Sequence, residues 1–256
     1  MSPSMIEAHG LSKYYGPFVA VDDISFVIPE GQVVAFLGPN GAGKTTMMRM
    51  LTGYLAPSSG EASIAGHDIR LDRIAASRRL GYLPENGPMY PDMTPIDLLQ
   101  FFGEAREIPS SELRTRIAAV VDLCALELVL EKPLGKLSKG YRQRVGMAQA
   151  LLHDPDVLIM DEPTAGLDPN QIRQFRDNIQ RLGRTKTVLI STHILHEAEA
   201  IADRLLLVNN GKLVFDGSVD ELKENGSLEQ PFYRLTEEKS AGNVTRDNET
   251  ESSVES

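Results

Sequence analysis

Short apolar runs separated by turn residues dominate the first 65 positions of the chain. Each run has the length and composition of a strand, and residues 57–60 (PSSG) have the composition of a turn. The pattern therefore predicts a β-rich beginning with four strands, at residues 5–8, 24–28, 32–37 and 61–65.

The middle of the chain changes to helical periodicity. Residues 95–105 form one helical pattern, and Ser110 and Ser111 are expected to cap a second helix at residues 112–123. We therefore expect an inserted helical subdomain at about residues 86–140, within a larger unit that spans residues 5–226.

After this insert, helices and strands alternate, as they do in a parallel α/β core. Residues 204–209 and 212–216, joined at Asn210-Gly211, then predict a hairpin. The predicted fold class is α/β, with an antiparallel β subdomain before the insert and no internal repeat. The expected alternating elements are a helix containing residues 143–153, a strand at 157–160, a helix at 169–182 and a strand at 187–190.

Acidic residues outnumber basic ones, with 36 Asp and Glu against 26 Lys and Arg, which gives a net charge of −10. Affinity for a phosphate backbone depends on basic surface, so nucleic acid is not an expected partner. Much of the acidity lies in residues 236–256, which contain few apolar side chains. This tail is predicted to be solvated or disordered, with an interaction tail as the alternative.

No apolar run approaches the roughly 18 to 20 residues that a membrane-spanning helix needs. The first residues lack the basic and apolar regions of a secretory signal, and Met5 is a second candidate start. The single cysteine, Cys124, lies in an apolar helical stretch at residues 117–130, where we expect a small buried hydrophobe. Together these features predict a chain of a reducing, cytoplasmic compartment.

A glycine-rich segment at residues 38–46 stands between an apolar strand and a helical pattern. Its G-x4-G-K-T spacing lets consecutive backbone N–H groups point at phosphate oxygens, while the next helix presents its positive end. Lys44 is expected to reach the β and γ phosphates and Thr45 to bind Mg²⁺. The segment indicates a P-loop NTPase core, and we call it the phosphate loop; its residues are Gly38, Pro39, Asn40, Gly41, Ala42, Gly43, Lys44, Thr45 and Thr46.

The alternative interpretation of the phosphate loop is a glycine-rich turn that binds no ligand. It is disfavoured because a strand and a helix both stand where phosphate binding requires them. A second element supports the phosphate interpretation, since the apolar strand at residues 157–160 runs into Asp161 and Glu162. Ligands of open α/β sheets bind at the carboxyl ends of strands. Asp161 is therefore expected to hold Mg²⁺ and Glu162 to polarise the attacking water, with Pro163 ending the strand.

Between these two elements, residues 137–144 (LSKGYRQR) resemble the signature of the ATP-binding subunits of ABC transporters. The family motif reads Leu-Ser-Gly-Gly-Gln, so Ser138 and Gly140 match while Lys139 and Tyr141 depart from it. The resemblance implies that this signature segment, with Ser138, Lys139 and Gly140, binds the γ-phosphate of ATP held by another subunit. Ser138 also suits a helix cap, which brings amides toward an anion.

The same resemblance assigns three further residues. Tyr15, or Tyr14 by a one-residue ambiguity, matches the aromatic that stacks on adenine. Asp168 ends a loop at residues 165–168 that crosses between the two subunits, and it also suits an N-cap before Pro169. His193 matches the switch histidine that senses the γ-phosphate, and the alternative of a metal pair with His196 lacks a third ligand.

One further departure concerns Glu85, which stands where the family has glutamine on the loop that joins the core to the helical subdomain. A carboxylate there could ligate Mg²⁺ or orient water. In having Leu-Pro-Glu at this loop, the chain resembles a branch of bacterial exporter ATPases. The resemblance therefore favours export over import.

The resemblance implies that two subunits pack head to tail around two molecules of ATP, as a homodimer or a heterodimer. Hydrolysis would then power transport through a separate membrane-spanning permease, with the ATPase at the inner face of the membrane. Two alternatives belong to other classes: a soluble ABC-type ATPase that acts on a macromolecular complex, and a regulatory module without catalysis. The presence of Glu162 disfavours the second alternative.

Overall fold

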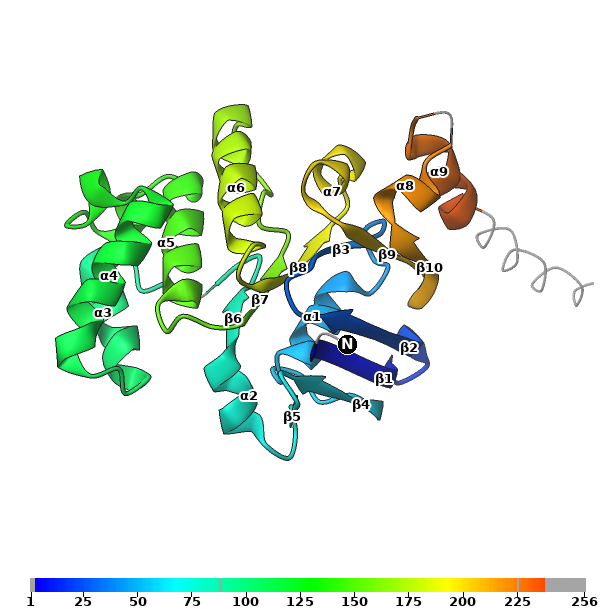
Figure 1. Ribbon diagram of the computed structural model, residues 1–256, viewed down its shortest axis with the longest axis horizontal. Coiled ribbons are helices and arrows are strands. Elements are labelled where there is room, and N and C mark those ends of the chain that lie inside the picture. Colours follow the sequence, from blue (N-terminus) through cyan, green and yellow to red (C-terminus); the bar gives the residue numbers. More distant parts are fainter. Residues whose placement is uncertain (1–2, 88, 225, 238–256) are drawn as a thin grey trace, which may run out of the picture.

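Two β-sheets form the framework of the protein in a computed structural model, which describes residues 3–87, 89–224 and 226–237 (Figure 1). The first sheet is antiparallel, with strand order β2-β1-β4-β5. Its strands are β1 (Ser4–Tyr15), β2 (Phe18–Pro29), β4 (Ser59–Ile64) and β5 (His67–Asp68).

The second sheet has the order β10-β9-β3-β8-β7-β6 and is parallel except for β10, which returns antiparallel to β9. Asn210 and Gly211, both with positive φ, make the turn of that hairpin as predicted. The strands are β3 (Val33–Leu37), β6 (Leu80–Leu83), β7 (Val157–Asp161), β8 (Thr187–Thr192), β9 (Arg204–Asn209) and β10 (Lys212–Ser218).

The central strands β3, β7 and β8 are buried along their whole length, as continuous apolar strands of a covered parallel sheet are. Their side chains alternate between two layers. Leu158 and Met160 pack in the cluster that includes the helical subdomain, whereas Val157 and Ile159 join the antiparallel sheet and α1 (Lys44–Leu51). Helix α1 therefore lies between the two sheets (Figure 1).

Helices α3 (Pro95–Ala105), α4 (Ser110–Cys124) and α5 (Lys139–Leu151) gather on one side of the parallel sheet (Figure 1). The α3 helix matches its predicted bounds and begins with a capping box at Thr94. One apolar cluster joins these helices to β7 and β8. The bounds of the helical subdomain, at about residues 86–140, and of the larger unit, at residues 5–226, stay predictions.

The predicted start of α4 was wrong. Neither Ser110 nor Ser111 caps a helix at residue 112, because α4 already begins at Ser110 and follows Pro109. The carbonyl of Pro109 accepts from the amides of Glu112 and Leu113. A backbone acceptor therefore satisfies these first-turn amides in place of a serine side chain. The helical stretch expected to reach residue 130 ends at Cys124, because Ala125 adopts the left-handed conformation that terminates helices. Cys124 is buried, as expected.

Two further predictions differ in length from the structure. The strand at residues 5–8 extends to Tyr15 through register shifts in β1. The strand at residues 24–28 already begins at Phe18 and ends at Pro29. Several short elements were not predicted, including β6 and α9 (Glu229–Glu237). The others are β5, α2 (Arg73–Arg79), α7 (Leu195–Ile201), α8 (Val219–Leu222) and the 3-10 helices η1 (Glu127–Val129) and η2 (Leu134–Lys136).

The remaining helix, α6 (Pro169–Leu182), has the predicted bounds. No helix in the part of the chain that the structure describes is long and apolar enough to cross a bilayer. The predicted acidic tail at residues 236–256 overlaps α9 at its first two positions and otherwise lies outside the described residues.

Candidate nucleotide site

The phosphate loop connects β3 to α1 at the carboxyl edge of the parallel sheet. Gly43 precedes the helix with φ 100°, and a Cβ there would lie 2.3 Å from the Ala20 carbonyl oxygen, so only glycine fits. No side chain caps α1. The amides of its first turn and its positive end are therefore left to face an anion.

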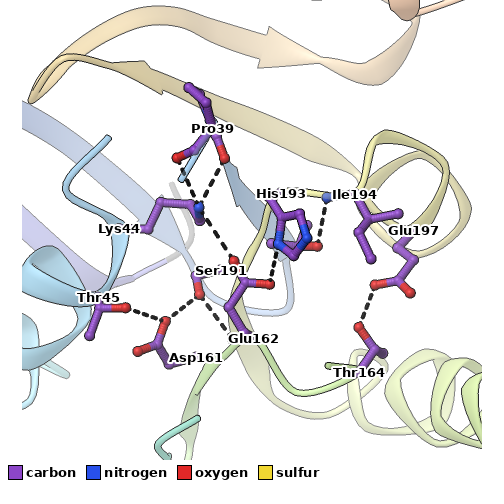
Figure 2. Close-up of polar contacts among 12 residues, drawn as sticks. Pro39, Lys44, Thr45, Asp161, Glu162, Thr164, Ser191, His193, Ile194 and Glu197 are labelled. Carbon is purple, nitrogen blue, oxygen red and sulfur yellow. Dashed lines mark hydrogen bonds and ion pairs between the residues drawn. The ribbon is translucent and has the colours of Figure 1, made fainter. Parts of the chain in front are cut away.

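Lys44 is the first residue of α1, and its side chain is only 6% exposed. Its Nζ donates to the carbonyl oxygens of Gly38 at 2.9 Å and Pro39 at 3.1 Å, and lies 3.3 Å from Oε1 of Glu162 (Figure 2). The buried cation is thus held by the backbone of its own loop and by the carboxylate of Glu162, which follows β7, two strands away from β3 in the sheet.

Asp161 is the last residue of β7 and is 1% exposed. Its Oδ1 accepts from the hydroxyl of Thr45 at 3.3 Å and from that of Ser191 at 2.5 Å. Ser191, opposite Asp161 on the neighbouring strand β8, also accepts from the backbone amide of Glu162 at 3.0 Å. Ser191 therefore fixes both acidic residues, a role that the sequence analysis missed.

Glu162 leaves the strand, and its backbone has φ 47°, in the left-handed region. That conformation costs a non-glycine residue on the order of 1 to 3 kcal/mol. The strand ends at Asp161, before the proline that was expected to end it. The turn places the two carboxylates differently, with Asp161 toward Thr45 and Glu162 toward Lys44 and His193 (Figure 2).

The carboxylate of Glu162 lies between two nitrogen groups. One oxygen faces Lys44, and the other lies 2.9 Å from Nδ1 of His193, which follows β8. The His193 side chain is 41% exposed, so it forms the open side of this cluster. Across the residues that the structure describes, no three His, Cys, Asp or Glu side chains are grouped to hold a metal by themselves, which leaves the metal pair with His196 unsupported.

A cavity of about 440 Å³ opens in front of the phosphate loop. Residues from five segments that are distant in the sequence line this cavity. They supply backbone amides, a cation and carboxylates, which are the groups that a nucleoside triphosphate site needs. The predicted residues that line it are Asn40, Gly41, Gly43, Lys44, Thr45, Thr46, Glu85, Glu162 and His193.

The predicted aromatic residues lie beside this cavity and not in its lining. Tyr15 ends β1 opposite Phe18 in the β1–β2 hairpin, and the ammonium of Lys13 lies 5.5 Å from its ring centroid. Phe18 is the aromatic residue that lines the cavity, and its side chain is 60% exposed. Phe18 was not predicted from the sequence, although it follows Tyr15 by three positions across a glycine-containing turn.

The predicted residues Ser138, Lys139, Gly140 and Asp168 form a second group that does not line this cavity. Ser138 caps α5 by accepting from the amide of Tyr141 at 3.3 Å, as predicted. Asp168 caps α6 through a capping box with Gln171, also as predicted. Gly140 packs against the Gln171 side chain, so the two helix starts touch.

The family model described as ABC transporter matches residues 21–165. A Nod factor export ATP-binding protein I of Ralstonia nicotianae is 38% identical over 222 residues, which cover 86% of this chain and 69% of that protein. The ABC transporter ATP-binding protein NatA of Bacillus subtilis is 38% identical over 217 residues, which cover 84% of this chain and 88% of that protein.

Solved structures agree with these sequence relatives. The ATP-binding subunit of an ABC transporter superposes with a TM-score of 0.83 at 29% identity, covering 90% of this chain and 99% of that one. A dimeric bacterial ABC transporter cassette has a TM-score of 0.77 at 24% identity, covering 84% of this chain and 99% of that one, and it supports the fold alone.

Proposed function

This chain belongs to the ABC transporter family as an ATP-binding subunit with ATPase activity, and we propose that it dimerises head to tail and drives export through a separate membrane-spanning permease. The observation that carries the proposal is the position of Glu162, whose carboxylate lies between Lys44 and His193 at the rim of the phosphate-loop cavity.

In this proposal the phosphate loop, Gly38 to Thr46, binds the phosphates of ATP through its amides and through Lys44. The ammonium of Lys44 exchanges its present carbonyl partners for phosphate oxygens, because a buried cation prefers the more negative group. Tyr15 stays our proposal for stacking on adenine, and Phe18, which lines the cavity, is a second aromatic surface for the base.

Glu162 acts as the general base of hydrolysis. A water molecule forms a bond to the γ-phosphorus as the bond from that phosphorus to the bridging oxygen breaks, and the water's proton passes to Glu162. His193 holds the second carboxylate oxygen and donates to the γ-phosphate once ATP is bound. The reaction releases ADP and inorganic phosphate.

The residues beside the phosphate loop fit a magnesium ion. The hydroxyl of Thr45 and the carboxylate of Asp161 converge, and oxygen ligands of this kind, completed by phosphate oxygens and water, are those that Mg²⁺ prefers. Bound there, the ion would neutralise charge on the β and γ phosphates. Glu85, which lines the same cavity, is the third proposed ligand.

A second subunit is needed because the signature segment does not line the cavity of its own chain. Ser138, Lys139 and Gly140 stand at the positive end of α5, where they would bind the γ-phosphate of ATP held by the partner. Asp168 and the loop at 165–168, which we call the crossing loop, would lie between the two subunits. ATP bound by both halves would favour the closed dimer, and hydrolysis would release it.

Transport requires a membrane-spanning partner, since no helix among the described residues could cross a bilayer. The export direction is supported by the similarity to the Nod factor export ATP-binding protein I. We place the contact with the permease near Glu85 and the helical subdomain. This chain would then sit at the inner face of the membrane.

The test is affinity isolation of the tagged Glu162→Gln chain with ATP from gently solubilised membranes, with Lys44→Ala as the matched control. We expect a stoichiometric polytopic membrane protein with Glu162→Gln and less of it with Lys44→Ala, because only the first chain should keep the ATP-bound state. Recovery of ribosomal or DNA-associated proteins alone would contradict the transport assignment and favour a soluble ATPase.

A further inference from the structure

A second cavity, of about 550 Å³, lies between the loop that follows β6 and the start of α5. Glu85 lines it from the loop, and Lys139 lines it from the first turn of the helix. Glu85 lines the phosphate-loop cavity as well. One carboxylate thus borders both the nucleotide site and the space that leads to the signature segment.

Glu85 and Lys139 carry opposite charges, and neither has an ion-pair partner within 4.0 Å among the described residues. The end of the Lys139 side chain instead lies over Gly166 in the crossing loop. A Cβ added to Gly166 would stand 2.7 Å from the Lys139 nitrogen, so the glycine makes room for this position. Both charged side chains are exposed and free to change rotamer.

Lys139 is also at an unusual place for a cation. It begins α5, where the helix dipole favours negative charge, and the first turn contains no acidic residue. The other cation on this cavity, Arg142, is held by a 2.5 Å hydrogen bond from its Nη1 to the carbonyl of Leu137. Lys139 is therefore the cation that can move toward Glu85.

We propose that Glu85 and Lys139 form an ion pair across this cavity when ATP closes the site, and that the pair positions the signature segment relative to the phosphate loop. The inference rests on the proposed function. It accounts for two departures at once, because the family motifs have a neutral glutamine and a neutral glycine at these positions.

The pair would also act through its neighbours, in addition to the contacts proposed for Glu85 with Mg²⁺ and for the start of α5 with the partner's γ-phosphate. Moving Lys139 off Gly166 releases the crossing loop, whose Ala165 lines the phosphate-loop cavity. Drawing Lys139 toward Glu85 also turns the start of α5 and its Ser138 cap. As water leaves the closing cavity, the attraction between the two charges strengthens.

A double-mutant cycle on steady-state ATP hydrolysis tests the pair. Glu85→Gln and Lys139→Gln should each lower kcat about fivefold. The double variant should lose clearly less than the product of about 25-fold, because the contribution of the pair is lost only once, whereas the separate roles proposed for Glu85 at Mg²⁺ and for Lys139 at the partner's γ-phosphate are lost independently. The matched control, Arg142→Gln, should combine additively with Glu85→Gln.

A loss of about 25-fold in the double variant, which is the product expected of independent residues, would overturn the inference. Wild-type hydrolysis is measured first. A wild-type chain that hydrolyses ATP while the cycle is additive would refute the ion pair and leave the proposed function standing.

A second measurement does not depend on hydrolysis. In a Glu85→Cys, Lys139→Cys chain that also carries Glu162→Gln, a short thiol-reactive crosslinker should join the two positions within one chain faster with ATP than without. Burial raises the pKa of Cys124 to about 12, so this native thiol does not compete. Crosslinking that ATP leaves unchanged would overturn the inference even if wild-type hydrolysis were absent.

Discussion

The residues of the phosphate-loop region and the residues of the signature segment differ in how completely their own chain surrounds them. Lys44, Asp161 and Glu162 are at least nine-tenths buried, and each has polar partners from neighbouring segments. Ser138 and Lys139 are exposed. The hydroxyl of Ser138 accepts from the amide of Tyr141, which caps its own helix and involves no distant segment.

This contrast indicates which half of the reaction centre is preorganised within one chain. Buried, mutually bonded groups keep their geometry without a ligand, so little reorganisation is needed when ATP arrives. The signature segment exposes the N-terminal end of α5. In our proposal its amides bind an anion only when a second subunit brings the phosphate of its ATP. Changes in the first region should therefore affect nucleotide binding, stability or catalysis through the single chain, whereas changes in the second should affect activity only through the dimer.

The largest expected effect comes from Glu162→Gln. Removing the general base should lower kcat about 10²-fold to 10⁴-fold, while ATP binding persists because the amide keeps the size of the side chain. Steady-state hydrolysis and light scattering with ATP measure both consequences, and we expect long-lived ATP-bound dimers.

The matched control for this change is Glu199→Gln, which alters an exposed carboxylate paired with Lys223 at 3.1 Å. It should leave hydrolysis within about twofold, since exposed ion pairs contribute little. Unchanged turnover in Glu162→Gln would contradict the role of Glu162 as the general base.

The next effect is expected from Ser191→Ala, which removes one of the two donors to Oδ1 of buried Asp161 and one of the two acceptors of the Glu162 amide. Each group keeps its second partner, so the two lost hydrogen bonds should together cost about 2 kcal/mol of unfolding free energy. Binding of a fluorescent ATP analogue to the single chain should weaken as well. Ser191→Thr, which keeps the hydroxyl, should restore most of the stability and most of the nucleotide binding. A stability equal to wild type in Ser191→Ala would show that the hydrogen bonds of the Ser191 hydroxyl do not stabilise the fold.

Acid should weaken the sheet that carries the buried region. Burial, assisted by the charge of Arg106, lowers the pKa of His153 to about 4 in the folded protein, and its Nε2 lies 3.0 Å from the carbonyl of Leu80. The unfolded chain takes up this proton near pH 6.5. The contribution is therefore complete above pH 6.5 and is lost as the pH falls toward 4.

Between pH 7 and pH 5 the loss from His153 should reach about 2 kcal/mol. Urea unfolding of the wild type and of His153→Gln, which cannot titrate, measures it as the difference between their pH slopes. Equal slopes in the two chains would assign the acid sensitivity to other groups.

The smallest expected effect, and the one that most sharpens the contrast, comes from Ser138→Ala. Loss of the cap of α5 should cost about 1 kcal/mol of stability. Nucleotide binding by the single chain should stay unchanged, while ATP-dependent dimerisation weakens. Weaker binding by the monomer would place Ser138 in its own chain's nucleotide site.

The parts of this picture that the sequence predicted are local ones. The phosphate loop, the Asp161-Glu162 strand end and the Asp168 cap each depend on a few consecutive residues whose spacing determines their geometry. The Asn210-Gly211 turn belongs to the same class, because two positive φ values demand those residue types.

The parts that it missed depend on contacts between distant segments. Ser191 matters because β8 pairs with β7 in a register that sets it opposite Asp161, and no local pattern encodes that register. Phe18 reaches the cavity through the hairpin that returns beside Tyr15. Short elements such as β6, with four residues, are too brief to show a periodicity.

The most direct test of two shared sites is complementation between two inactive chains. Lys44→Ala should abolish the buried half-site, and Ser138→Arg should block the exposed one, so each chain alone should be inactive. In an equal mixture, half of the dimers pair one chain of each kind and contain one intact site, so activity should recover to about a quarter of wild type. A mixture as inactive as its two components would contradict the claim that each site is built from two chains.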